Sequence, residues 1–290
     1  MSNNPTPSPA KKLEQIPVFY TPLMVADADS YSPSAAKPKA AVASWRKLDI
    51  PLEVIAPEPV TVAEIARAHL PRFVDAVLSC QSDNGFGNRS QAVAKSLPYT
   101  NGAMLAAARA AIRNGRVAVA PVSGFHHAGY SQAGGFCTFN GLMITALALH
   151  GAGDVKRVGI LDFDQHYGNG TDNIINHLGI DWIRHYSAGQ HFGSPEKADT
   201  FLSAIPNIVM DMKDCDVILY QAGADPHIND PLGGWLTTQQ LYERDRLVFE
   251  TAAKLGIPVA WNLAGGYQTP LRKVLEIHDN TMRECADIHI

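Results

Sequence analysis

Residues 157–171 read Arg157-Val158-Gly159-Ile160-Leu161-Asp162-Phe163-Asp164-Gln165-His166-Tyr167-Gly168-Asn169-Gly170-Thr171. The segment 158–161 is apolar and shows no polar alternation, which predicts a parallel strand that is buried on both faces. Alternate side chains of an extended chain share one side, so Asp162, Asp164 and His166 are expected to point the same way. Asp164 and His166 therefore form a natural metal-binding pair where this strand ends.

The composition indicates one large α/β domain. The chain has 290 residues, of which 46% are hydrophobic and 18% are charged. Its 24 basic and 28 acidic residues give a net charge of -4, so no general attraction to nucleic acid is expected. DNA and RNA are therefore not predicted as direct partners.

The ends of the chain and its cysteines favour the cytoplasm. Residues 1–14 are polar and proline-rich and lack the apolar core of a secretory signal, so we expect a flexible tail before a single catalytic domain at residues 15–290. No apolar segment is long enough to span a bilayer, so no membrane partner is predicted. Scattered cysteines are typical of reduced cytoplasmic thiols; here they are Cys80, Cys137, Cys215 and Cys285.

Polar groups also follow the other predicted strands, which lie at residues 117–122, 217–221 and 258–263. The groups that follow them are His126, His127, Asp230 and Tyr267. Open parallel sheets place their active sites at the carboxyl edge of the strands. We therefore expect these loops to converge with Asp164 and His166. The adjacent histidines suit divided tasks, in which one polarises water and the other shuttles a proton.

Helical segments alternate with these strands. Residues 61–64 match a capping box and begin a helix in which His69 is interpreted as a packing residue. Residues 81–98 are rich in Gly, Asn and Ser and predict a long loop, of the kind that often borders a substrate pocket. Residues 101–113 are alanine-rich and predict the next helix, which Gly115 ends.

Five motifs together resemble the zinc-dependent histone deacetylase and acetylpolyamine amidohydrolase family, within the arginase/deacetylase superfamily. They occur in the family's order between residues 16 and 290. The motifs are Gly-x-His-His-Ala at 124–128, Gly-Gly-Phe-Cys-x-Phe-Asn at 134–140, Asp-x-Asp-x-His-x-Gly-Asn-Gly-Thr at 162–171, Gly-Ala-Asp with Asp-Pro-Leu-Gly within 223–233, and Gly-Gly-Tyr at 265–267. The resemblance implies a three-layer αβα fold around a central, mostly parallel sheet, as in bacterial histone deacetylase-like amidohydrolases.

The resemblance also implies the site residues. The implied zinc ligands are Asp164, His166 and Asp230. The implied catalytic residues are His126, His127, Tyr267, Asp162 and Asn169, where Asp162 lies behind His126 and Asn169 behind His127. The implied potassium ligands are Asp162 and Ser187. The implied substrate-binding residues, which would wall a tunnel for an acyl-lysine, are Phe136, Gly135 and Phe192.

The chemistry of these residue types agrees with the resemblance. One imidazole and two carboxylates leave an open position on zinc for water, as in catalytic sites. Because two anionic ligands offset the metal charge, a nearby general base is needed, and the histidine pair supplies it. We expect His127 to be the base and later the proton donor, and His126 to act through its charge. Zinc and the Tyr267 hydroxyl would stabilise the oxyanion.

The sequence departs from the family at a few positions. Tyr167 stands where the family often has a second histidine, and Gln165 is more polar than usual. Asn169 replaces an aspartate of some relatives, which predicts a less strongly charged pair with His127. No acid between residues 83 and 103 clearly matches the rim aspartate of many peptide-acting members. This weakens the case for histone or other peptide substrates, although not for deacylase chemistry.

The sequence therefore predicts a zinc enzyme that hydrolyses an N-acyl amide of lysine or of a small amine. Two alternatives stay open. One is an inactive deacetylase fold that binds acylated ligands or a partner. The other is a binuclear manganese ureohydrolase, which Gly168 disfavours because that family needs a carboxylate two residues after the histidine. The sequence leaves the acyl group and the amine open, and it is compatible with a homo-oligomer.

Overall fold

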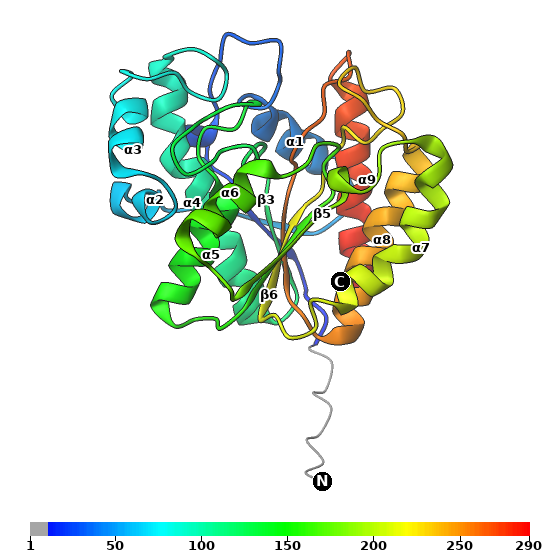
Figure 1. Cartoon of the computed structure of the whole chain (residues 1–290). Coiled ribbons are helices and arrows are strands. Elements are labelled where there is room, and N and C mark those ends of the chain that lie inside the picture. Colours follow the sequence, from blue (N-terminus) through cyan, green and yellow to red (C-terminus); the bar gives the residue numbers. More distant parts are fainter. Residues whose placement is uncertain (1–10) are drawn as a thin grey trace.

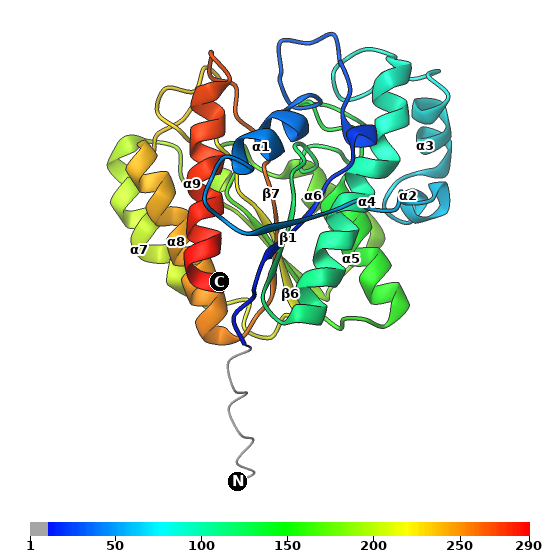
Figure 2. The same cartoon turned by 180° about the vertical axis from the view of Figure 1, so that it is seen from behind.

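The structure is a computed structural model, and it describes residues 11–290 (Figures 1 and 2). Within these residues, seven parallel strands form one sheet in the order β2-β1-β3-β7-β6-β4-β5. The strands are β1 (Ile16–Phe19), β2 (Leu52–Ile55), β3 (Val117–Ala120), β4 (Val158–Asp162), β5 (Ile183–Ser187), β6 (Val217–Gln221) and β7 (Val259–Asn262). The predicted three-layer α/β fold is confirmed.

Helices cover both faces of the sheet. On one face lie α2 (Val62–Ala68), α3 (Pro71–Leu78), α4 (Gln91–Asn114), α5 (Gly141–Ala152) and α6 (Asn169–Leu178) (Figure 1). On the other face lie α1 (Lys37–Trp45), α7 (Ala198–Met210), α8 (Thr238–Leu255) and α9 (Arg272–His289) (Figure 2). Short 3-10 helices occur at η1 (Pro22–Met24), η2 (Ala188–Gln190) and η3 (Pro195–Lys197). Among the described residues, no helix is both long and apolar enough to cross a membrane.

Strand side chains alternate between two hydrophobic cores. In β6, Val217 and Leu219 belong to the core under α4 and α5, whereas Ile218 and Tyr220 belong to the core under α7, α8 and α9. Every residue of β6 is buried, as is every residue of β3 and β4. The missing polar alternation of these strands follows from apolar helices on both faces.

Helix α4 begins earlier than predicted. Residues 91–98, which the sequence suggests are loop, form its first turns. The Ser90 hydroxyl caps the helix by accepting the N–H of Val93 at 3.3 Å. Pro98 lies inside the helix, and the buried side chains of Val93 and Leu97 pack on the core around it. The packing of these side chains thus compensates for the backbone hydrogen bond that α4 loses at Pro98. The capping box at Thr61 is confirmed.

Part of the expected N-terminal tail contacts the domain. Residues 1–10 lie outside the described residues, so the tail prediction is untested there. The N–H of Leu13 donates to the carbonyl oxygen of His289 at 2.8 Å. The Leu13 side chain also packs against the core under α8 and α9. Contact with the domain therefore begins before residue 15.

Candidate active site

The candidate site lies where four neighbouring strands end. β3, β7, β6 and β4 are adjacent in the middle of the sheet. The loops that follow them gather at one edge of the sheet, toward the top of the view in Figure 1. These loops are residues 121–140, 263–271, 222–237 and 163–168. Because parallel strands end at one edge, side chains that are distant in sequence meet here.

The loop after β4 is organised by its own carboxylates. β4 ends at the fully buried Asp162, whose Oδ1 accepts the N–H of Asp164 at 3.2 Å. Oδ1 of Asp164 accepts the N–H of His166 at 2.9 Å. Two successive Asx turns, in which an aspartate side chain accepts the N–H two residues later, therefore shape this loop. The strand itself does not extend to Asp164 and His166.

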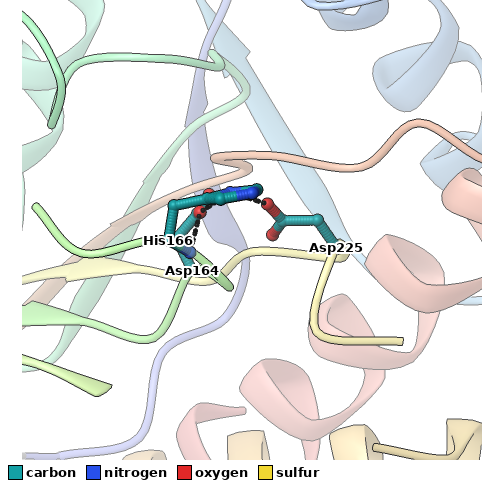
Figure 3. A group of neighbouring side chains, drawn as sticks. All are labelled: Asp164, His166 and Asp225. Carbon is teal, nitrogen blue, oxygen red and sulfur yellow. Dashed lines mark hydrogen bonds and ion pairs between the residues drawn. The ribbon is translucent and has the colours of Figure 1, made fainter. Parts of the chain in front are cut away.

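Asp164, His166 and Asp225 form a compact group of three possible metal ligands (Figure 3). Their ligand atoms all lie within 4.8 Å of one another. Nδ1 of His166 lies 3.3 Å from Oδ1 of Asp164 and 3.2 Å from Oδ2 of Asp225. Apart from this contact with His166, the buried Oδ2 of Asp225 has no hydrogen-bond partner among the described residues. A bound cation would compensate such a buried carboxylate oxygen.

The charges of this group act strongly on one another. Burial and the neighbouring Asp164 raise the pKa of Asp225. Hydrogen bonds to Asp164 and Asp225 raise the pKa of His166 to about 11. Burial would raise the pKa of Asp164, but His126 and His166 outweigh it and lower that pKa. Two buried carboxylates thus hold a proton on the imidazole between them, in the position where a shared metal ion would compensate both.

The third carboxylate of this group is Asp225. Asp230, which the resemblance implies as a zinc ligand, lies outside the group, and its role as a ligand stays a prediction. Oδ2 of Asp230 accepts the N–H of Tyr267 at 2.8 Å, and Oδ1 accepts the N–H of Leu232 at 3.1 Å. β6 ends at Gln221, so Asp225 lies four residues beyond the strand (225 minus 221) and Asp230 lies nine beyond it (230 minus 221).

The adjacent histidines have different partners. Nδ1 of His126 lies 2.8 Å from Oδ2 of Asp162, and Nδ1 of His127 lies 2.6 Å from Oδ1 of Asn169. Burial would lower the pKa of His126, but Asp162 and Asp164 outweigh it and raise that pKa to about 9. Burial and the neighbouring His126 lower the pKa of His127. At neutral pH the pair therefore consists of a cationic His126 and a neutral His127.

Gly135 and Phe136 lie beside this pair. Gly135 has a φ of +55° and approaches the His127 ring so closely that a Cβ at 135 would collide with it. The Phe136 ring lies 5.5 Å from the Tyr267 ring and 5.3 Å from the exposed Tyr31 ring, measured between centroids. Phe136 thus provides an apolar wall next to Tyr267.

Other predicted residues lie farther from this wall. Phe192 packs on Phe201 and Trp235, at centroid distances of 5.1 and 6.0 Å, so its place in a tunnel stays a prediction. Cys137 is buried and unpaired, and burial raises its pKa to about 12, as a packing cysteine requires. The Tyr167 hydroxyl donates to Asp172 and contributes no ligand to the metal group.

Ser187 lies next to Asp162. Its hydroxyl donates to Oδ2 of Asp162 at 3.4 Å and accepts the N–H of Gly168 at 3.0 Å. Gln221 donates to Oδ1 of the same carboxylate at 3.1 Å. The two residues expected to bind potassium are therefore neighbours, and the ion itself stays a prediction.

Tyr267 follows a turn in which two residues have unusual backbone angles. Ala264 has a φ of +49°, which is uncommon for a residue with a Cβ, and Gly266 has a φ of +141°. The N–H of Gly265 donates to Oδ2 of Asp164 at 2.8 Å. A Cβ at residue 265 would collide with the Asp225 carboxylate. The turn that carries Tyr267 is thus built directly against the metal group.

Lys37 contacts the same turn from the start of α1. It is fully buried, and its Nζ donates to the carbonyl oxygens of Ala264 at 2.7 Å and Gly265 at 3.2 Å. Burial lowers the pKa of Lys37 to about 8, against the raising effect of Asp225, Asp164 and Asp230. No sequence pattern predicts this contact, because Lys37 lies among other lysines and prolines far from every motif.

Most of the chain matches one protein family. Residues 34–179 and 184–282 match the histone deacetylase domain. An uncharacterized protein of Picosynechococcus sp. is 28% identical over 262 residues, which cover 82% of this chain and 87% of that protein. Histone deacetylase 6 of Caenorhabditis elegans is 28% identical over 188 residues, which cover 53% of this chain and 19% of that protein. The matched region is thus a small part of the second relative.

Two solved structures share the fold. The HDA15 HD domain has a TM-score of 0.76 and 22% sequence identity, and covers 92% of this chain and 90% of that chain. Acetylpolyamine aminohydrolase from Burkholderia pseudomallei has a TM-score of 0.72 and 16% identity, and covers 94% of this chain and 99% of that chain. At these identities the likeness concerns the fold alone.

Proposed function

Because the chain belongs to the histone deacetylase family, we propose that it is a zinc-dependent amidohydrolase. Its substrate would be an N-acyl amide of lysine or of a small amine, and its products a carboxylate and a free amine. One observation carries the proposal. The compact group of Asp164, His166 and Asp225 lies beside a histidine pair whose members face different partners, a carboxylate and an uncharged amide.

Asp164 and His166 would hold one zinc ion per chain together with one carboxylate of the loop after β6. The compact group favours Asp225 as this third ligand, and the resemblance implies Asp230. One imidazole and two carboxylates are a donor set that leaves a position for water and substrate. When bound, zinc would lower the pKa of water and polarise the substrate carbonyl. Ligating imidazole must be neutral, so His166 would release its proton on binding. Metal analysis tests this assignment, since two manganese ions per chain would instead support a ureohydrolase.

His127 is the proposed general base. Its Nδ1–H donates to Oδ1 of Asn169, which leaves the unprotonated Nε2 as the proton acceptor. Nε2 takes a proton from water as the water oxygen bonds to the carbonyl carbon, and returns it to the nitrogen as the C–N bond breaks. His126, which Asp162 keeps cationic, stabilises the negative charge that develops on the carbonyl oxygen.

Tyr267 is the proposed hydrogen-bond donor to the carbonyl oxygen. Burial and the charge of Asp225 raise the pKa of Tyr267, so its hydroxyl stays protonated and able to donate. The apolar ring of Phe136 beside it would exclude water from the substrate chain. A positioned donor of this kind is most effective where charge forms in the transition state.

We also propose that potassium binds near Asp162 and Ser187. The support is the meeting of a buried carboxylate and a hydroxyl at the ends of β4 and β5. Oxygen ligands of this kind suit hard cations. Turnover in potassium chloride is compared with turnover in tetramethylammonium chloride at equal ionic strength. Equal turnover of the wild type in the two salts would contradict the proposal. A potassium effect that is as large in Ser187→Ala as in the wild type would contradict the role of Ser187.

The substrate class is kept open between protein lysines and small amines. One structural neighbour is named as an acetylpolyamine aminohydrolase, and a sequence relative is named as a histone deacetylase. Asp83, at the start of the loop before α4, is exposed and bonds Arg89 at 2.8 Å. Its carboxylate is therefore already paired, which gives no special support to recognition of a peptide backbone.

Hydrolysis by the zinc-loaded protein tests the proposal. The substrates are acetyl-lysine peptides, longer acyl-lysines and acetylated polyamines, and Tyr267→Phe is the control. Activity on one class that is lost in the variant supports amide hydrolysis and names the substrate. A folded, zinc-loaded protein that is inert toward the whole panel contradicts the proposal and favours a binding role.

A further inference from the structure

Lys37 is a buried cation that the proposed mechanism does not use. It is the first residue of α1 and has no exposed surface. Its location is unfavourable in two respects. Burial removes an ammonium group from water, and a cation in the first turn of a helix opposes the helix dipole. Lys37 therefore contributes nothing to α1 by its charge, and the compensation must come from what the ammonium contacts.

The ammonium contacts the turn that carries Tyr267. Its hydrogen bonds go to the carbonyl oxygens of Ala264 and Gly265, at 2.7 and 3.2 Å. These are consecutive carbonyls, and Ala264 is held in the left-handed region of backbone space. A non-glycine residue in that region persists only where surrounding contacts determine it. Lys37 supplies two of these contacts from a helix more than 200 residues away in sequence.

The opposite side of the turn is held by carboxylates. The N–H of Gly265 donates to Asp164, and the N–H of Tyr267 donates to Asp230. The backbone segment is thus fixed between a cation that binds its carbonyls and two anions that bind its N–H groups. Each contact is a charge-assisted hydrogen bond, which is stronger than a neutral one. This arrangement fixes the position of the Tyr267 backbone.

We propose that Lys37 is a positioning residue, whose buried ammonium holds the carbonyls of Ala264 and Gly265 so that Tyr267 reaches the substrate carbonyl. The expected effect of Lys37 on kcat rests on the proposed function. The expected effect of Lys37 on the backbone at residues 264–266 does not. Lys37 acts through Tyr267 and touches no substrate atom.

The first measurement requires no substrate. Hydrogen–deuterium exchange is followed in residues 263–268 of the zinc-loaded protein and of Lys37→Met, which keeps an unbranched apolar side chain one atom shorter but removes its charge and donors. We expect faster exchange of this segment in Lys37→Met, because opening of the turn exposes the amides of Gly265 and Tyr267. Lys39→Met, an exposed lysine two residues along α1, is the matched control and should leave exchange unchanged.

The second measurement is a double-mutant cycle with Tyr267→Phe. We expect Lys37→Met to lower kcat about a hundredfold, the effect of misplacing a reacting group by about 1 Å, with little change in KM. In the Tyr267→Phe background the same substitution should lower kcat by less than about threefold, because the group that Lys37 positions is already absent. Lys37→Arg should recover most of the loss, and zinc content should stay at the wild-type level.

Three results would overturn the proposal. The first is unchanged exchange in residues 263–268. The second is an equal fold-loss of kcat from Lys37→Met in the wild type and in Tyr267→Phe, because Lys37 would then act independently of Tyr267. The third is loss of zinc in Lys37→Met, because Lys37 would then support the metal site itself. If Lys37→Met does not fold, Lys37→Gln takes its place and unchanged exchange is again decisive. A wild-type protein without hydrolytic activity would refute the proposed function alone, since exchange still tests Lys37.

Discussion

Nδ1 of His127 lies 2.6 Å from Oδ1 of Asn169, a side chain without charge. The adjacent His126 faces the carboxylate of Asp162 at nearly the same distance, 2.8 Å. Each acceptor receives the Nδ1–H of its histidine, but only the carboxylate adds a negative charge. The two neighbouring imidazoles therefore have opposite protonation states at neutral pH, and His127 is the one that can accept a proton.

Asn169→Asp should shift the pH dependence of turnover. The new carboxylate favours protonated His127 and should raise its pKa by about one unit or more. Because the neutral form is the proposed base, the acidic limb of kcat/KM should move to higher pH by the same amount. The profile is measured from pH 5 to 9, with Asn176→Asp on the exposed side of α6 as a charge control. An unmoved limb would show that His127 is not the base.

Tyr267→Phe should remove turnover without removing zinc. The substitution deletes one hydroxyl beside an apolar wall, so the fold and the metal group should persist. We expect kcat to fall about a hundredfold or more, the usual effect of losing one donor to a developing oxyanion. Turnover, zinc content and near-UV circular dichroism are compared with those of the wild type. Near-normal kcat would refute the proposed role of Tyr267.

The sequence predicted that these side chains meet because local rules place them. Asp164, His166 and the histidine pair lie in the loops that follow two buried strands, and parallel strands end at one edge. The order of the strands is not written in any local pattern. That order makes β3, β7, β6 and β4 neighbours, and it explains why four distant loops meet.

The parts that the sequence missed depend on long-range contacts. Asp225 and Asp230 lie in one loop, and only the three-dimensional path of that loop brings Asp225 beside Asp164 and His166 and brings Asp230 to the N–H of Tyr267. Which of the two carboxylates binds zinc stays a prediction. Lys37 donates a hydrogen bond to the turn at residues 264–266, which is more than 200 residues away in the sequence. Helix α4 passes through Pro98 because tertiary packing overrides local propensity. None of these contacts has a local signature.

Asp225→Ala and Asp230→Ala should separate the two carboxylates of this loop. Asp225→Ala removes one of three ligands and should abolish stoichiometric zinc binding. Asp230→Ala should retain zinc but lower kcat about tenfold to a hundredfold, because the N–H of Tyr267 loses its acceptor. Zinc per chain is measured by mass spectrometry after dialysis. Full zinc in Asp225→Ala, with zinc loss in Asp230→Ala, would restore the original expectation from the sequence.

His69 should make the fold sensitive to acid. Its Nε2 accepts the N–H of Asn140 at 2.8 Å, so its Nδ1–H donates to the carbonyl oxygen of Gly129, also at 2.8 Å. Both bonds together require a neutral ring, and burial lowers the pKa of His69 to about 4. An unfolded histidine has a pKa of about 6.5. The stability that this neutral ring contributes is therefore complete above about pH 6.5 and is lost as the pH falls toward about 4.

His69→Gln removes this titration and tests it. At pH 7.5 the variant should be less stable than the wild type, because its side chain cannot reproduce both ring contacts. Between pH 7.5 and pH 5 the difference in free energy of unfolding should shrink by about 2 kcal/mol, since only the wild type must keep an uncharged histidine buried. Urea unfolding at several pH values measures the difference, with the exposed His177→Gln as the control. A difference that is independent of pH would mean that His69 has the same pKa in the folded and unfolded protein, which would contradict a ring that must stay neutral to hold Asn140.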